Sequence, residues 1–240
     1  MLDASPIPSP EGPTAGRKPE AGPKPEATGF LYPFLEATET DAEALLIDLA
    51  GSARMKADTS ASLRASVLGA TAEARSRAAV AMAAAFASGG HMFTFGNGGS
   101  STDAASVAAL FSRPPWGTSL AARCLVEDTA ILTALGNDVG FDLVFSRQLI
   151  AHARSGDIAV AFSTSGNSRN VLMAFAEARK RGLTTIGFAG YDGGDMGRSG
   201  DVEHCLVVPS ESVHRVQEVQ AALAFALWEG VQAALQLEPR

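Results

Sequence analysis

The spacing of apolar and polar positions changes near residue 90. From Ala42 to about Ala87, apolar residues recur every three or four positions, which is the period of an amphipathic helix. The stretch ends at Gly89–Gly90, a common helix stop, and a polar run near Lys56–Ser60 predicts a division into two helices. The pattern therefore predicts two N-terminal helices ahead of the rest of the chain.

Beyond this point, short apolar runs alternate with amphipathic helical segments. Strands buried on both faces of a sheet have this nearly continuous apolar character. The alternation predicts an α/β fold, a doubly wound parallel five-stranded sheet of the flavodoxin-like sandwich type with additional N-terminal helices. Such a fold binds its ligand at the carboxyl ends of the strands. The predicted strands are residues 91–96, 119–126, 157–164, 184–190 and 204–210.

Composition divides the chain into three parts. Residues 1–28 contain seven prolines and few large apolar side chains, so we expect a disordered tail. Residues 29–90 hold an aromatic segment, Phe30–Ala37, and the N-terminal helices, and both are expected to pack on the folded body or on a partner subunit. Residues 91–240 form the predicted ligand-binding α/β domain.

Charge and cysteine content exclude several classes of protein. A net charge of −7 disfavours direct binding of nucleic acid, because phosphate backbones are held by clustered Lys and Arg. Cys124 and Cys205 lie in apolar surroundings and read as free thiols of a cytoplasmic protein, with a disulfide or a metal pair as the alternatives. No apolar run is long enough to span a membrane, and no secretory leader is visible.

Two turns that could hold an anion follow predicted strands. "GNGGS" (96–100) follows the first, and "STSGNS" (163–168) follows the third and opens a helix. Glycines let the backbone approach a ligand closely, and hydroxyls and helix N-termini donate hydrogen bonds to phosphate. Neither turn contains lysine, which disfavours a nucleotide triphosphatase. Together the turns favour a phosphate monoester.

Five blocks occur in order: "FGNGGSSTDA", "LGNDVGFDLVFSRQL", "GDIAVAFSTSGNSRNV", "GFAGYDGGDM" and "RVQEVQ". Over about residues 38–237 the chain resembles the sugar isomerase (SIS) domain of the bacterial phosphoheptose isomerase family. Members convert sedoheptulose 7-phosphate to a heptose 7-phosphate, usually as homotetramers with sites shared between subunits. The resemblance implies a heptose or ketose phosphate as ligand and no cofactor. It implies that the phosphate is held by Ser163, Thr164, Ser165 and Ser168, and that the sugar lies near Asn97, Gly98, Ser100, Asp138 and Gln217.

The positions expected to transfer protons differ from the family pattern. Isomerisation through an enediol needs a base near C1 and C2 and an acid that serves the oxygens. The family places a Glu on the helix after "GNGGS" and a His on the last helix, and by spacing these positions are Leu110 and Phe225. A zinc-binding His of some members falls on Ser106, a poor ligand alone, so no metal is expected. The family has an acidic residue just before the block that is "RVQE" here, and in this chain that position is His214.

Two hypotheses follow from these replacements. The first is an isomerase with a relocated acid/base pair, for which His214 and Glu218 are the candidates, with Asp103 as an alternative to its interpretation as a helix cap. The second is a catalytically silent sugar-phosphate sensor or protein-docking module. It would be similar to the DnaA initiator-associating proteins, with which the chain shares "GNSR" (166–169) and "GYDGG" (190–194).

Overall fold

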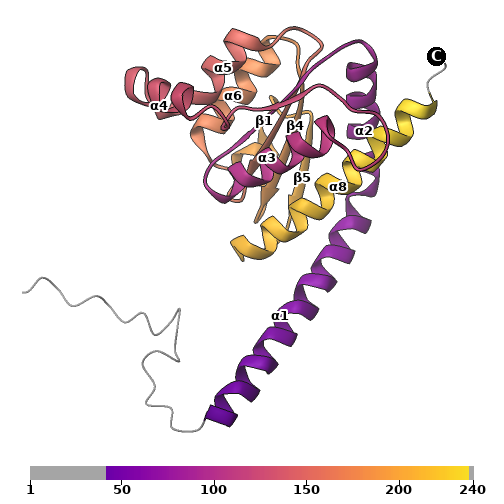
Figure 1. Ribbon diagram of the computed structural model, residues 1–240, viewed down its shortest axis with the longest axis vertical. Helices are drawn as coiled ribbons and strands as arrows, with labels where there is room; N and C mark the ends of the chain where they lie inside the picture. Colours follow the sequence, from indigo (N-terminus) through magenta and orange to yellow (C-terminus); the bar gives the residue numbers. More distant parts are fainter. Residues whose placement is uncertain (1–41, 238–240) are drawn as a thin grey trace, which may run out of the picture. The chain divides into compact units, whose positions relative to one another are not determined.

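The computed structural model describes residues 42–237. The chain divides into two compact units, residues 1–52 and 53–240, and the description below concerns the second unless stated otherwise (Figure 1). The predictions of a disordered tail and of a packed aromatic segment at Phe30–Ala37 lie outside the described residues.

The N-terminal helices divide at a different place from the one predicted. Helix α1 runs from Ala42 to Ala70 and α2 from Ala72 to Ala87, so the predicted break near Lys56–Ser60 is wrong. Within that run the Thr59 hydroxyl donates to the carbonyl of Met55 at 2.7 Å, which satisfies a polar side chain inside a helix. The division falls at Thr71.

The strands form one five-stranded sheet in which every neighbouring pair is parallel. The order is β2-β1-β3-β4-β5, which confirms the predicted doubly wound fold of the flavodoxin-like kind. The second strand, predicted over residues 119–126, has only three residues in the structure. The strands are β1 Met92–Gly96, β2 Ala122–Cys124, β3 Ile158–Ser163, β4 Thr184–Gly190 and β5 His204–Val208.

Helices connect the strands, as the alternating pattern predicted, and the short helix α7 follows β4. Asp128 caps α4, where its carboxylate accepts from the Ile131 amide at 3.0 Å. The remaining elements are α3 Gly99–Ser112, α4 Thr129–Asp138, the 3-10 turn η3 Phe141–Leu143, α5 Val144–His152, α6 Arg169–Lys180, α7 Gly194–Arg198 and α8 Val213–Leu237.

The sheet carries a hydrophobic core on each face because its side chains alternate between the two. In β3, Ile158, Val160 and Phe162 belong to one cluster, whereas Ala159 and Ala161 belong to the other. The first cluster is covered by α2, α3 and α8, and the second by α5, α6 and α7. Helices α2 and α8 lie side by side, as Figure 1 shows.

Both cysteines are free thiols, as predicted. Burial raises the pKa of Cys205 to about 11 and also raises the pKa of Cys124. Within residues 42–237, no helix has the length and apolar character required to cross a bilayer.

Two glutamines of α8 are buried but differ in their hydrogen bonds. The side chain of Gln232 accepts from the Thr118 amide at 2.7 Å and donates to the Thr118 carbonyl at 2.9 Å. Gln220 is fully buried, and neither polar atom of its side chain bonds to any residue that the structure describes. An unsatisfied buried amide lowers stability, whereas a paired one supports it.

We expect Gln220→Met to raise the free energy of unfolding by about 1 kcal/mol, because methionine keeps the shape and removes the unpaired amide. This corresponds to a rise in Tm of about 2–4 °C. Gln232→Met is the matched control and should lower Tm, because it breaks both bonds to Thr118. Thermal denaturation measures both variants. A lower Tm for Gln220→Met would contradict the assignment of its amide as unpaired.

Candidate functional site

The candidate site lies at the carboxyl ends of β1 and β3, where the strand order predicts it. These strands are neighbours, with Gly96 opposite Phe162, but the chain leaves them toward opposite faces of the sheet. Helix α3 packs in the first hydrophobic cluster and α6 in the second. The crevice between such connections is the usual ligand site of an open parallel sheet.

The β1 turn, Gly96–Ser100, leads directly into α3. Gly98 has φ +54° and ψ −125°, a conformation that glycine adopts without strain. A Cβ on Gly96 would lie 2.6 Å from the Ser100 carbonyl oxygen and 2.9 Å from that of Phe162, so the backbone is close on both sides. The first turn of α3 contains no acidic residue, which leaves its positive dipole end without a carboxylate.

The β3 turn, Ser163–Ser168, leads into α6. The hydroxyls of Ser163 and Ser168 lie 3.1 Å apart across the turn, and that of Ser165 accepts from the Asn167 amide at 3.2 Å. Ser163 is buried and Ser165 is exposed, so the turn offers hydroxyls from its floor to its rim. The α6 N-terminus follows at Arg169, which adds amide donors and a favourable dipole for an anion.

A pair of asparagines joins the two turns. Asn97 donates to Asn170 Oδ1 at 2.8 Å, and Asn170 donates in return to Asn97 Oδ1 at 2.9 Å. Asn170 is buried in the first turn of α6, and sequence reasoning missed it. Its signal was a polar residue at a position whose neighbours along the helix are apolar. Asn97, predicted to bind sugar, therefore already uses part of its amide to hold the turns together.

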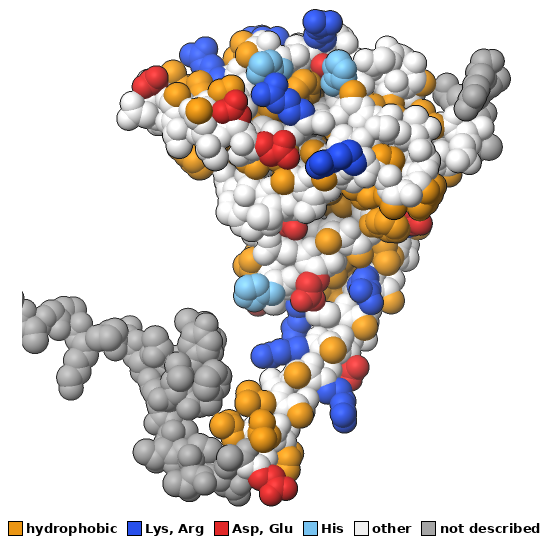
Figure 2. All heavy atoms as spheres, in the orientation of Figure 1, with side chains coloured by type: hydrophobic (Ala, Val, Ile, Leu, Met, Phe, Trp, Pro, Cys, Tyr) orange, Lys and Arg blue, Asp and Glu red, His pale blue; other side chains and the backbone are white. Residues whose placement is uncertain are grey.

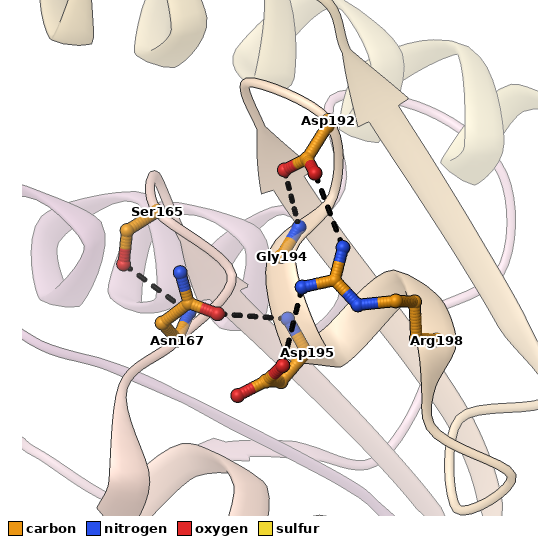
Figure 3. A network of polar contacts seen from close by, with 6 residues as sticks. All are labelled: Ser165, Asn167, Asp192, Gly194, Asp195 and Arg198. Atoms are coloured by element: carbon orange, nitrogen blue, oxygen red, sulfur yellow. Dashed lines mark hydrogen bonds and ion pairs between the residues drawn. The ribbon is translucent and has the colours of Figure 1, made fainter.

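The segment before and within α7 supports the β3 turn from the other side. The Asp195 amide donates to Asn167 Oδ1 at 2.8 Å, as Figure 3 shows. The Met196 amide donates to the Gly166 carbonyl at 2.9 Å. Gly193 and Gly194 have positive φ and lie against the turn so closely that a Cβ on Gly166 would be 2.1 Å from the Gly193 oxygen. The "YDGGD" segment is thus a support of the turn.

The aspartates of this segment are engaged by Arg198. Its guanidinium contacts Asp192 at 3.1 Å and Asp195 at 3.2 Å (Figure 3). The Gly194 amide, followed by Arg198, holds the pKa of Asp192 below its ordinary value. In the part of the chain that the structure describes, no group of three or more His, Cys, Asp and Glu side chains is placed to hold a metal ion.

Gln217 and Asp103 meet beside the β1 turn. The Gln217 amide donates to Asp103 Oδ2 at 3.2 Å, and it lies so close to Gly99 that a Cβ there would be 2.4 Å from its nitrogen. Asp103 is in the second turn of α3, so its interpretation as the helix cap is wrong. Burial raises the pKa of Asp103, and the bond from Gln217 opposes that rise.

The other predicted residues are placed less centrally. His214 and Glu218 lie one helical turn apart and are exposed on α8. Asp138 is the last residue of α4, is exposed, and accepts from the side chain of Asn137 at 2.8 Å. Ser100 is buried in the first turn of α3. The structure thus brings Gln217 to the β1 turn and joins that turn to the β3 turn, whereas no bond within residues 42–237 ties His214, Glu218 or Asp138 to either.

Comparisons with known proteins identify the family. The SIS domain model matches residues 57–190, more than half of the chain. A phosphoheptose isomerase of a Bradyrhizobium species (strain ORS 278) is 42% identical over 183 residues, which cover 74% of this chain and 89% of that protein. One from Sulfurimonas denitrificans is 49% identical over 129 residues, 51% of this chain and 63% of that protein.

A solved structure agrees with these sequences. The phosphoheptose isomerase from Neisseria gonorrhoeae superposes with a TM-score of 0.72 at 34% identity, over 77% of this chain and 99% of that one. The chain therefore belongs to the SIS domain family and, within it, to the family of the phosphoheptose isomerases.

We expect Gly166→Ala to lower the free energy of unfolding by about 2–3 kcal/mol, because the new methyl would strike the Gly193 carbonyl at a φ of +68°. Gly136→Ala is the control: it lies within α4 with nothing within 4 Å, and should stabilise by about 0.5–1 kcal/mol. Urea unfolding measures both. Equal stability of Gly166→Ala and the parent would show that the turn is loose.

Proposed function

We propose that this member of the phosphoheptose isomerase family binds a phosphorylated ketose, of which sedoheptulose 7-phosphate is the first to test, at the carboxyl ends of β1 and β3. The observation that carries the proposal is the pairing of the two turns through Asn97 and Asn170, which holds the N-termini of α3 and α6 beside each other at the carboxyl ends of β1 and β3. Anions bind at helix N-termini through free amides and the helix dipole.

In this proposal the two turns divide the ligand between them. The phosphate lies in the β3 turn, on Ser163, Thr164, Ser165 and Ser168. The sugar extends toward the β1 turn, with Asn97, Gly98, Ser100 and Gln217 nearest and Asp138 reaching it from α4. Support comes from the contact of Gln217 with Gly99 and from the hydroxyls that line the β3 turn.

We further propose that the chain binds its ligand without the proton transfer of the usual family pair. By spacing, Leu110 and Phe225 occupy the Glu and His positions, and neither side chain can carry a proton. Leu110 is half-buried against the first hydrophobic cluster. Phe225 is 43% exposed and packs on Trp228 with ring centroids 5.2 Å apart. Both positions are thus used for apolar packing, which suits a sensor of sugar phosphates.

An isomerase that uses Asp103 is the second candidate function. A carboxylate with a raised pKa can take a proton from the carbon beside the carbonyl and return it to the former carbonyl carbon of the enediol, while a proton passes from the hydroxyl oxygen of the first carbon to the former carbonyl oxygen. Asp103 is half-buried, has its pKa raised by burial, and is held by Gln217 beside the β1 turn. The earlier candidates His214 and Glu218 have neither the burial nor the contact.

Two properties implied earlier also stand as proposals. A homotetramer is supported by the large apolar side chains that α1 exposes, among them Leu46 and Ile47, each 65% exposed. A cytoplasmic location is supported by the two free thiols, since disulfides form in oxidising compartments.

Sedoheptulose 7-phosphate tests the two candidates directly. A sensor should gain about 2.7 kcal/mol of stability at 100 times Kd and yield no heptose product by NMR. Ser165→Ala should weaken binding about tenfold by removing a hydroxyl donor, whereas Ser62→Ala on α1 should change nothing. Product formation would overturn the silent sensor and favour the isomerase. If the protein shows neither stabilisation nor turnover with this sugar phosphate, both candidates are overturned.

Asp103→Asn tests separately the effect of this carboxyl on stability and its role in proton transfer. Because its pKa is raised in the folded protein, the charged form costs stability above its folded pKa, and the cost disappears below the unfolded value of 3.8. We therefore expect Asp103→Asn to raise Tm at pH 7 and the gain to shrink as pH falls toward 4. Asp58→Asn, exposed on α1, is the control.

Any isomerase activity should be lost in Asp103→Asn while ligand-induced stabilisation remains. Turnover that survives this substitution would remove Asp103 from the mechanism.

A further inference from the structure

A cavity lies at the amino ends of β1 and β2, the end of the sheet opposite the proposed sugar-phosphate site. It has a volume of about 410 Å³ and a floor of Met92 and Phe93. Four basic side chains line it: His91, Arg123, His152 and Arg154. Figure 2 shows Lys or Arg and His side chains at the upper end of the view, with a few Asp or Glu side chains among them.

The two arginines of this cavity are not paired with acidic side chains in the part of the chain that the structure describes. No ion pair within residues 42–237 includes Arg123 or Arg154. The nearest bonded carboxylate is that of Asp157, which is 4% exposed and accepts from the backbone amides of His91 at 2.8 Å and Arg154 at 2.7 Å. Each of its oxygens accepts one backbone amide, and neither forms an ion pair with Arg123 or Arg154, so the guanidinium groups remain available to a ligand.

The cavity is separate from the proposed sugar-phosphate site. His91 precedes β1 and Asn97 follows it, and at about 3.3 Å per residue of strand their Cα atoms lie about 20 Å apart. All five residues of β1 are buried, so the packed strand separates the cavity from the turns at its other end. A ligand held here would not compete for the β3 turn.

We propose that this cavity is a binding site for a small anion that carries two phosphate groups. Two arginines supply fixed charge and forked donors that match phosphate oxygens, and two histidines on the same rim supply further donors. The volume falls within the range of small-molecule sites, about 300–1,000 Å³. A nucleic-acid backbone fits less well, because the patch is a single concave cluster on a chain with a net charge of −7.

Inorganic pyrophosphate is the probe, titrated by calorimetry into the full chain. We expect saturable binding that weakens about tenfold in Arg123→Gln and in Arg154→Gln, each of which removes one charge-assisted contact. Both side chains are exposed, so the variants should fold, which their Tm verifies. Arg147→Gln is the matched control, because this exposed arginine lies on α5 outside the cavity.

Other outcomes overturn the proposal. These are an absence of saturable binding, equal weakening in Arg147→Gln, or binding that is lost in Ser165→Ala but kept in Arg123→Gln, which would place the pyrophosphate in the β3 turn. Tighter binding of a DNA duplex than of pyrophosphate would also reject it in favour of a nucleic-acid surface. Because the arginine variants leave both turns intact, failure here and failure of the sugar-phosphate proposal are distinguishable.

Discussion

The reciprocal hydrogen bonds between Asn97 and Asn170 are the interaction on which the site depends. A parallel sheet fixes the spacing of β1 and β3 only as far as the ladder runs, and the ladder ends at Gly96 and Phe162. Beyond the ladder, the segments that follow β1 and β3 leave toward opposite faces of the sheet, and no backbone hydrogen bond of the sheet fixes their relative position. Two part-buried hydrogen bonds between side-chain amides hold them in register at the place where a ligand would touch both.

The interior on either side of the sheet explains why this arrangement is well defined. Alternate side chains of each central strand enter different clusters, so a shift by one residue would exchange the two faces of the sheet. Phe162 and Phe188 stack at 4.5 Å on one face, while Phe95 packs against Phe145 and Phe175 on the other. The turns therefore begin from strand ends whose positions are set by packing.

Much of this fold could be predicted from the sequence because buried parallel strands are nearly continuous apolar runs. The runs that contain Val160 and Ile186 are of this kind, and both strands begin and end within a residue of the prediction. Near Lys56 the prediction failed, because a helix tolerates a short polar run when a side chain such as Thr59 bonds back to its own backbone.

The site was harder to predict, since its key bonds join residues far apart in the chain. Asp103 looked like a cap from its neighbours along the sequence, but α3 begins at Gly99, four residues earlier, and Asp103 bonds instead to the distant Gln217. Asn170 gave no local sign that its partner stands more than seventy positions away. Hydroxyls and glycines in a sequence indicate that a turn can hold an anion. Which distant side chain bonds to that turn depends on how the helices pack.

The close contact between the β3 turn and the segment before α7 has a consequence for how this protein could change. A Cβ on Gly166 would lie 2.1 Å from the Gly193 oxygen, and a Cβ on Gly194 would lie 2.4 Å from the Ser165 oxygen, so neither position has room for a side chain. The Asn167 side chain also accepts a hydrogen bond from the backbone of the opposite segment. A change in ligand preference through a larger residue in one loop would require a matching rearrangement in the other. The two loops therefore form one evolutionary unit, and loop exchange between relatives should succeed only when both are transferred together.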